Sequence, residues 1–134
     1  MIVVDSNVIA YCWLNGPKTG LAQRVRVTDP DWRVPVLWRS EMRSILAGYL
    51  RDGSLSPAEA RRVMRQIEEA LEGREHLMAS DAVLRVVVEV TRLSAYDAEL
   101  VALAQELSVP LVTEDTAVRK AFPATALSMD GFLA

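Results

Sequence analysis

Short apolar runs alternate with longer segments of helical periodicity along this chain, and that alternation limits the folds open to it. The first run is Ile2–Val4, a second covers residues 33–36 and a third covers residues 109–113. Runs this short and this apolar are typical of strands that are buried on both faces. The segment 37–51 repeats apolar residues at helical spacing instead. Strands that alternate with amphipathic helices predict an α/β fold, with helices on both faces of a short parallel sheet.

The limits of the expected elements follow from periodicity and from capping residues. Ser56, Pro57 and Glu59 combine a helix cap, a first-turn proline and a capping-box acid. In the segment 80–93 three consecutive valines favour a strand, but the spacing of its apolar residues favours a helix. We expect helices at 8–14, 17–28, 37–51, 57–71, 80–93, 95–107 and 116–121, and strands at 2–4, 33–36, 75–78, 109–113 and 126–128. Because no repeat or linker interrupts this pattern, we expect one domain over residues 1–134.

A single cysteine and a single histidine restrict the chemistry of the chain. Cys12 has no partner for an internal disulfide, and Cys12 with His76 cannot supply the several ligands of a zinc cluster. No apolar run approaches the roughly 20 residues that span a bilayer. The first residues also lack the pattern of a signal peptide. We therefore expect a cytoplasmic protein that does not contact membranes.

The formal net charge of −3 restricts the way in which this chain could bind nucleic acid. Proteins that hold nucleic acid by electrostatics alone are usually basic, because contacts to phosphates supply much of their affinity. An acidic protein can instead present carboxylates to divalent metal ions, and those ions can meet a phosphate. The charge therefore excludes a simple basic clamp and leaves a metal-dependent enzyme open.

Four acidic residues stand at the edges of predicted elements. Asp5 and Asp115 each follow a predicted strand, at the edge where ligands bind in open parallel sheets. Glu41 and Asp97 each lie near the start of a predicted helix. If the four converge, each pair of carboxylates about 5 Å apart repels by roughly 3 kcal/mol. Hard cations such as Mg²⁺ or Mn²⁺ relieve that repulsion, so the sequence predicts a candidate metal site for phosphodiester cleavage.

Each of these acids also has a purely structural explanation. Asp5 and Asp115 equally fit helix caps or turn residues. Asp97 equally fits a capping box with Ser94, and Glu41 equally fits a solvated acid favoured by the helix dipole. The sequence leaves both explanations open for each residue.

Polar residues near the four acids are further candidates. Asn7 and Thr113 have the chemistry to position water or a ligand, and they equally fit capping or turn roles. Arg39 and Arg43 lie one helical turn apart and are candidates for contacts to phosphates of RNA, although they equally fit a solvated helix face. Glu99 is expected on a solvent-exposed face.

With these residues in place, the sequence resembles PIN-domain proteins, and specifically the VapC-type toxins of bacterial and archaeal toxin–antitoxin pairs. Four segments carry the resemblance, each around one acid, and their order and spacing fit nearly the whole chain. They are Ile-Val-Val-Asp-Ser-Asn at 2–7, Trp-Arg-Ser-Glu at 38–41, Ser-Ala-Tyr-Asp-Ala at 94–98 with Val-Ala-Leu-Ala at 101–104, and Leu-Val-Thr-Glu-Asp at 111–115.

The resemblance implies both a fold and an activity. The fold is a PIN-like three-layer α/β/α arrangement with a short central parallel sheet. The activity is cleavage of RNA by an endoribonuclease that depends on Mg²⁺ or Mn²⁺. By position, Asp5, Asp97 and Asp115 are implied as metal ligands, and Glu41 as a ligand or a base that orients water. The resemblance also implies a homodimer and inhibition by a cognate antitoxin protein.

Other functions stay open on the sequence alone. A PIN-domain nuclease can process RNA without an antitoxin, and a PIN-like scaffold can bind RNA or protein without cutting. A helix-rich binding module would use all four acids as caps or turns. A phosphatase of the haloacid-dehalogenase type also places an aspartate after its first strand, but it needs a second aspartate where Asn7 stands.

Overall fold

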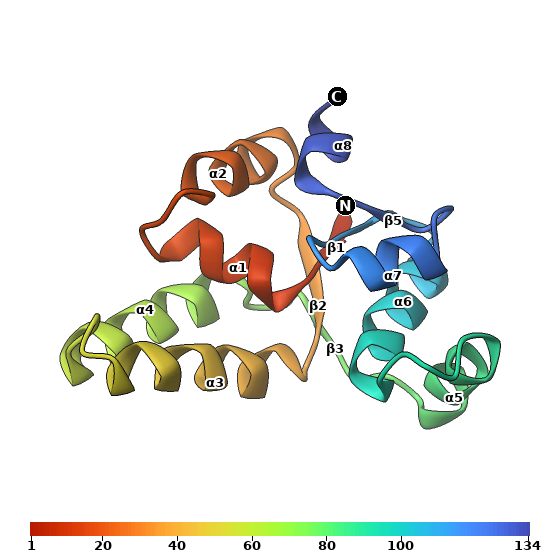
Figure 1. The fold of residues 1–134 in the computed structure, drawn as a ribbon, viewed down its shortest axis with the longest axis horizontal. Coiled ribbons are helices and arrows are strands. Elements are labelled where there is room, and N and C mark those ends of the chain that lie inside the picture. The colour runs from red at the N-terminus through yellow and green to blue at the C-terminus, as the bar shows by residue number, and fades with distance from the viewer.

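The computed structural model describes residues 1–134 and contains one five-stranded sheet, in which all neighbouring strands are parallel (Figure 1). The strands are β1 (Ile2–Val4), β2 (Trp32–Pro35), β3 (Glu75–His76), β4 (Leu111–Val112) and β5 (Ala126–Leu127). Their order across the sheet is β3-β2-β1-β4-β5, which places β1 at the centre. The expected short parallel sheet is confirmed.

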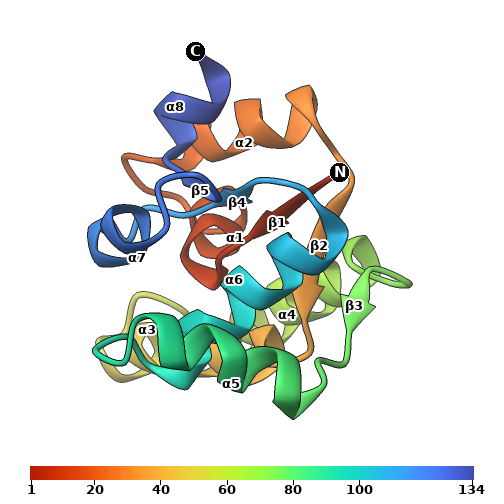
Figure 2. The same cartoon turned by 90° about the vertical axis from the view of Figure 1, so that its right-hand side faces the viewer.

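Helices cover both faces of this sheet. They are α1 (Ser6–Trp13), α2 (Thr19–Thr28), α3 (Trp38–Arg51), α4 (Pro57–Ala70), α5 (Ser80–Glu89), α6 (Ala95–Leu107), α7 (Thr116–Ala121) and α8 (Met129–Leu133). Figure 1 shows α1 to α4 on the left of the sheet and α5 to α7 on the right, and α5 and α6 lie on the side that faces the viewer in Figure 2. None of the helices combines the length and the apolar character that crossing a membrane requires.

The side chains of β1 show why the fold has three layers. Successive residues of a strand point to opposite faces of the sheet. Ile2 and Val4 belong to the larger hydrophobic core, under α1 to α4, whereas Val3 belongs to a second core under α5, α6 and α7. In register, Val3 pairs with Leu111 and Val4 with Val112, and each pair shares one core. The α/β/α arrangement is therefore confirmed.

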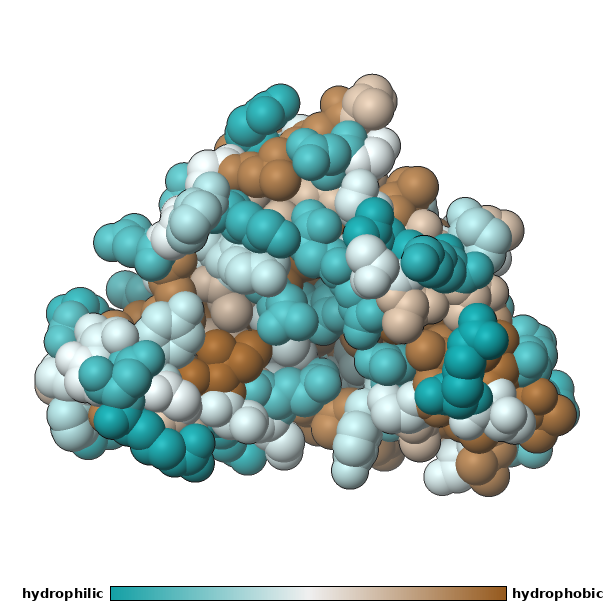
Figure 3. Space-filling model, in the orientation of Figure 1, coloured by the Kyte–Doolittle hydropathy of each residue, from teal (hydrophilic) through white to brown (hydrophobic).

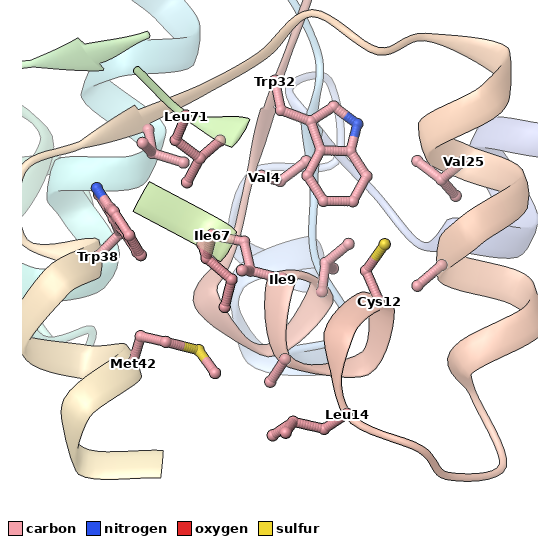
Figure 4. Packing of buried hydrophobic residues seen from close by; sticks show 14 of the residues in the cluster. Val4, Ile9, Cys12, Leu14, Val25, Trp32, Trp38, Met42, Ile67 and Leu71 are labelled. Atoms are coloured by element: carbon pink, nitrogen blue, oxygen red, sulfur yellow. The ribbon is translucent and has the colours of Figure 1, made fainter. Parts of the chain in front are cut away.

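The larger core fixes the first helix of the chain against the third. Figure 4 shows Trp32, Ile9 and Cys12 packed between α1 and α2, with Trp38 and Met42 of α3 on the other side of the core. All five side chains are buried, Cys12 as a free thiol without a disulfide. This packing matters for function because α1 and α3 carry polar residues that meet at one edge of the sheet.

The segment 80–93 forms a shorter helix than the sequence predicts. The helix α5 ends at Glu89, and Val90 leaves the helical conformation with φ −138° and ψ 84°. Ser94 must itself be extended to cap α6, with φ −67° and ψ 157°, so a helix cannot run up to it. Residues 90–94 therefore form the turn that brings α6 back against α5.

The last helix, α8, was not expected. Ser128 caps it by accepting a hydrogen bond from the backbone N–H of Gly131 at 2.9 Å. The helix is only five residues long, and Met129 anchors it in the larger core beside α2. A segment this short carries too few residues for helical periodicity to be visible in the sequence.

Candidate active site

Two of the four predicted acids lie at the centre of the sheet's carboxyl edge. Asp5 follows β1 directly, and Asp115 lies three residues after β4. The chain passes from β1 to β2 and β3 on one side and returns to β4 and β5 on the other, so β1 and β4 flank the point where the strand order reverses. Open parallel sheets bind their ligands at this point.

Thr113 holds the two aspartates in a fixed relation. Its hydroxyl donates a hydrogen bond to Oδ2 of Asp5 at 2.7 Å and accepts one from the backbone N–H of Asp115 at 3.1 Å. The Thr113 side chain has no exposed surface, and Asp5 is only 7% exposed. The carboxylate of Asp5 is therefore oriented by a buried hydrogen bond rather than by solvent.

Glu41 joins this pair from α3. The buried Ser6 hydroxyl at the start of α1 donates a hydrogen bond to Oε1 of Glu41 at 2.9 Å, which ties α3 to α1. Burial raises the pKa of Glu41, and the negative charges of Asp5, Asp97 and Glu99 raise it further, against the opposing effect of Ser6. One carboxylate raises the pKa of another only when the two lie close together.

Asp97 completes the cluster from the first turn of α6. Burial raises the pKa of its carboxyl group, and the charges of Asp115 and Asp5 add to that effect, while the Ser94 hydroxyl opposes it. The structure thus places Asp5, Glu41, Asp97 and Asp115 near enough at this edge for their charges to influence one another. In the space-filling view, hydrophilic side chains gather around a hollow at the centre of the molecule (Figure 3).

The capping explanations hold for some of these residues and fail for Asp97. Asp5 and Asp115 do cap helices: Asp115 accepts from the backbone N–H of Ala117 at 2.9 Å, and Asp5 accepts a long bond of 3.5 Å from that of Asn7. In α6 the Ser94 hydroxyl accepts from the N–H of Asp97 at 3.1 Å. The reciprocal bond from the Ser94 N–H to the Asp97 carboxylate is absent, so this carboxylate is free for another partner.

The polar surroundings of Glu41 form a small open hollow of about 210 Å³. Its lining consists of Asp5, Ser6, Asn7, Glu41, Ser44 and Ile45. Asn7 is exposed here and Ser44 lies one helical turn beyond Glu41, whereas Thr113 is buried behind Asp5. Asn7 and Ser44 are therefore placed to meet a ligand at this edge, and Thr113 is placed to orient Asp5.

The carboxylate oxygens of the site suit a hard cation that keeps part of its water shell, rather than a cation enclosed by protein ligands. Oε2 of Glu41 and Oδ2 of Asp115 accept no hydrogen bond from the protein, and the Asp97 carboxylate interacts only with the Ser94 hydroxyl. No group of three or more aspartate, glutamate, histidine or cysteine side chains is arranged so that it could hold a metal ion by itself. Mg²⁺ commonly binds through one or two carboxylates and keeps several of its waters, so the free oxygens fit this mode.

The two candidate arginines do not reach the acidic cluster. The guanidinium of Arg39 donates to both oxygens of Glu75, at 2.8 and 2.7 Å, and also to Glu68, so three of its five N–H groups are already used. Arg43 is exposed and forms no ion pair. Each lies two residues from Glu41 in α3, on the side of the helix that faces away from that carboxylate.

Glu99 lies nearer to the site than the sequence predicts. It was expected on a solvent face, but its side chain is half-buried and burial raises its pKa. Its charge also contributes to the raised pKa of Glu41. The signal for this was present: Ala98 and residues 100–104 are all apolar, so Glu99 is the one charged residue in a stretch of α6 that packs inside the fold.

Comparisons with known proteins agree with the fold of the chain. A family model described as the PIN domain matches residues 2–122. The crystal structure of FitAcB from Neisseria gonorrhoeae has a TM-score of 0.76 at 18% sequence identity, covering 96% of this chain and 98% of that one. The crystal structure of PAE2754 from Pyrobaculum aerophilum has a TM-score of 0.73 at 21% identity, covering 98% of this chain and 92% of that one.

At these identities the two structures share the fold with this chain over nearly its whole length, and they show the fold alone. No curated protein sequence matches the chain. The family model, by contrast, spans the segments that contain Asp5, Glu41, Asp97 and Asp115. On this match, the chain belongs to the PIN-domain family.

Proposed function

We propose that this chain is a divalent-metal-dependent endoribonuclease whose active site consists of Asp5, Glu41, Asp97 and Asp115. The observation that carries the proposal is the meeting of these acids from four elements at the reversal point of the sheet. None of the four forms an ion pair with a lysine or arginine. PIN domains are in general nucleases that use divalent metal ions, which is the chemistry that such unneutralised charge favours.

The residues of the site have separable roles in this proposal. Asp5, Asp97 and Asp115 would hold Mg²⁺ or Mn²⁺, and the bound cation would supply positive charge to the phosphate and favour ionisation of water. Thr113 fixes the carboxylate of Asp5 through its buried hydroxyl. Glu41, whose pKa is raised, is a stronger base than an exposed glutamate and is suited to orient water or take its proton.

We further propose that the nuclease is the toxin of a toxin–antitoxin pair, that it is inhibited by a cognate antitoxin protein, and that it acts as a homodimer in the cytoplasm. The support is the resemblance of the motifs at 2–7, 38–41, 94–104 and 111–115 to VapC-type toxins. These motifs extend over nearly the whole chain in the order of that group.

The test is cleavage of a labelled set of structured and single-stranded RNAs in the presence of Mg²⁺, Mn²⁺ or EDTA. Wild type is compared with Asp97→Asn and with Glu106→Gln, a control that removes one exposed acid from the same helix far from the site. We expect metal-dependent cleavage by wild type and by Glu106→Gln, and a loss of about 100-fold or more in Asp97→Asn. Equal rates in all three proteins would refute the proposed site.

The toxin proposal has a separate test. Wild type and Asp97→Asn are each expressed in a bacterial host from an inducible promoter, and growth is followed. We expect arrest with wild type and normal growth with the variant. Metal-dependent cleavage without growth arrest would favour an RNA-processing nuclease that has no antitoxin.

A further inference from the structure

Four arginines of the chain are half-buried, and one of them differs from the other three. Arg33, Arg39 and Arg74 each form an ion pair with a carboxylate. Arg119, in α7, is buried to a similar degree but forms no ion pair with any acid of the protein. Because a guanidinium stays protonated in proteins, its partial removal from water without a partner costs free energy.

The Nε atom of Arg119 makes this cost larger, since it is buried and has no hydrogen-bond partner in the protein. Two other buried side-chain nitrogens are also without a partner, in Trp32 and His76, but Arg119 is the one whose group always carries a charge. A buried donor that is left unpaired destabilises a fold, and a charged donor does so more strongly. The chain itself does not offset this cost, which points to a partner outside the chain.

The position of Arg119 in α7 places it next to the acidic site. It follows Asp115 by four residues, and residues four apart lie on the same face of a helix. Helical side chains also lean toward the start of their helix, which for α7 is the end at Asp115. Figure 3 shows strongly hydrophilic side chains over α7, to the right of the central hollow. The guanidinium is therefore directed toward the edge of the sheet that carries the acids.

Arg119 lies near Asp115 but does not neutralise it. No nitrogen of Arg119 lies within 4.0 Å of a carboxylate oxygen. Asp115 uses Oδ1 to cap α7, and its Oδ2 accepts no hydrogen bond. A direct ion pair would occupy both groups. In this arrangement the carboxylate stays available for a cation and the guanidinium stays available for an anion.

The chemistry of this edge indicates that the anion is a phosphate. The planar guanidinium presents its N–H groups as a fork that matches two oxygens of a phosphate. An RNA strand whose phosphodiester lies at the acids brings further phosphates to the residues around them. The arginines of α3 do not serve this purpose, because Arg39 is already bound to two glutamates and Arg43 lies on the side of α3 that faces away from Glu41.

We propose that Arg119 binds a backbone phosphate of the RNA while the phosphodiester to be cleaved lies at the four acids. The proposal rests on the nuclease function proposed above and adds to it a substrate contact outside the acidic cluster. Phosphates are common to every RNA sequence, so this contact positions the strand and does not select bases. The RNA phosphate also supplies the partner that the Nε of Arg119 lacks within the chain.

The first test measures RNA binding separately from cleavage. Labelled single-stranded RNA is titrated with Mg²⁺ and the Asp97→Asn protein, which is expected to leave the RNA intact, and then with the same protein carrying Arg119→Met or Lys120→Met. Lys120 is the matched control, because it is an exposed cation of the same helix on a different face. We expect Arg119→Met to raise the Kd about tenfold and Lys120→Met to raise it less than about twofold.

The dependence on salt identifies the contact as one to a phosphate. Each lost phosphate contact lowers the slope of log K against log salt concentration by about 0.7 to 1. We expect Arg119→Met to lower the slope by this amount for every RNA sequence tested. Arg119→Lys keeps the charge but not the planar fork, so it is expected to restore the slope and only part of the affinity. In cleavage by the otherwise unchanged protein, Arg119→Met is expected to raise KM with little change in kcat.

Thermal unfolding without RNA separates a substrate contact from a structural role. Methionine keeps an unbranched apolar side chain and removes the unpaired guanidinium, so Arg119→Met is expected to melt no lower than wild type. A variant that melts lower but binds RNA as tightly as Lys120→Met shows that the guanidinium is structural. Equal RNA affinity in Arg119→Met and Lys120→Met refutes the contact at any melting temperature. If cleavage by wild type is intact, that result refutes the contact alone, whereas a wild type that neither binds nor cleaves RNA refutes the nuclease as well.

Discussion

Thr113 uses both hydrogen-bonding functions of its hydroxyl group inside the protein. It donates to Asp5 and accepts from the N–H of Asp115, and no solvent reaches it. Valine has the same shape but lacks the hydroxyl, so Thr113→Val leaves a buried carboxylate oxygen and a backbone N–H without this partner. We expect a loss of about 1–3 kcal/mol in the free energy of unfolding. We also expect a 10- to 100-fold loss of cleavage, because partners that orient metal ligands have effects of that size.

Thr113→Ser is the control for this prediction, since it keeps the hydroxyl and removes only a methyl group. Urea unfolding and RNA cleavage measured on the two variants separate the hydrogen bond from packing. If Thr113→Val cleaves RNA as fast as Thr113→Ser, the orientation of Asp5 does not limit the reaction.

Arg39 and Arg43 differ in their partners although they lie one turn apart on α3. Arg39 makes a two-pronged contact to Glu75 and also donates to Glu68, whereas Arg43 is exposed without an ion pair. We expect Arg39→Ala to lower the free energy of unfolding by about 1–2 kcal/mol and Arg43→Ala to leave it unchanged. Cleavage by the folded protein is expected to stay the same in both, because neither residue faces Glu41. A selective loss of RNA affinity in Arg43→Ala would restore that residue as a phosphate contact.

The effect of Arg39→Ala depends on pH in a defined direction. Hydrogen bonds and charge from Arg39 hold the pKa of Glu75 below its ordinary value of 4.5 in the folded protein. A carboxyl group whose pKa is lowered on folding contributes stability above its unfolded pKa, and that stability is lost as the pH falls through the folded value. The difference between wild type and Arg39→Ala is therefore expected to be full at neutral pH and to shrink below about pH 4.5. Urea unfolding across this range checks it.

Sequence reasoning placed the acids of the site better than the arginines, and the reason is physical. Asp5 and Asp115 follow strands, so the parallel topology alone brings them to one edge. Arg39 lies beside Glu41 in sequence, but its partners Glu68 and Glu75 are 29 and 36 residues away. Such long-range ion pairs leave no periodic signal. Only the tertiary structure shows that Glu68 and Glu75 engage the guanidinium of Arg39.

At the scale of elements, substitutions at two helix caps distinguish an effect on stability from an effect on RNA cleavage. Ser56 caps α4 in a complete capping box with Glu59, far from the acids, and Ser94 caps α6, which carries Asp97. We expect Ser56→Ala and Ser94→Ala each to lower the free energy of unfolding by about 1 kcal/mol. Only Ser94→Ala is expected to slow cleavage, because its hydroxyl also lowers the pKa of Asp97 and fixes the turn that carries it. Equal activity in the two variants would show that the start of α6 does not need this cap to form the site.

The accuracy of the predicted limits varies among the helices and among the strands. α3, α4, α6 and α7 begin and end within one residue of the predicted limits, because apolar periodicity and caps agree there. The strand predicted at 109–113 is paired as a ladder only at Leu111–Val112. How far a strand is paired depends on its neighbours in the sheet, and that information lies elsewhere in the chain.

The apolar content of α5 shows a different limit of prediction from sequence. The three valines at 86–88 made the segment 80–93 ambiguous between strand and helix, because apolar residues occur on more than one face. The structure forms a helix with Val86 inside and Val88 outside. The ambiguity therefore arises because α5 carries apolar residues on an outer face as well as on the face that packs against α6.

At the scale of the whole molecule, the acidic site lies where the two hydrophobic cores meet. Glu41 belongs to a helix over the larger core and Asp97 to a helix over the second core, while Asp5 and Asp115 follow the two central strands. Folding therefore forces like charges together, and packing on both sides of the sheet opposes their repulsion. The raised pKa values of Glu41 and Asp97 record this conflict. Without a cation, the site costs the fold stability.

The repulsion among the four acids predicts that Asp97→Asn changes the melting temperature in opposite directions with and without metal. In EDTA, Asp97→Asn removes one charge from the cluster and is expected to melt at a higher temperature than wild type. Mg²⁺ at about 100 times its dissociation constant is expected to stabilise wild type by about 2.7 kcal/mol, because it binds the folded state alone. The variant is expected to gain little, so the order of the two melting temperatures reverses as Mg²⁺ is added. Glu106→Gln, which removes an equal charge outside the cluster, should follow wild type in both conditions. If Asp97→Asn melts below wild type in EDTA, the carboxylate of Asp97 stabilises the metal-free fold. Metal binding then does not stabilise the protein by relieving repulsion among the acids.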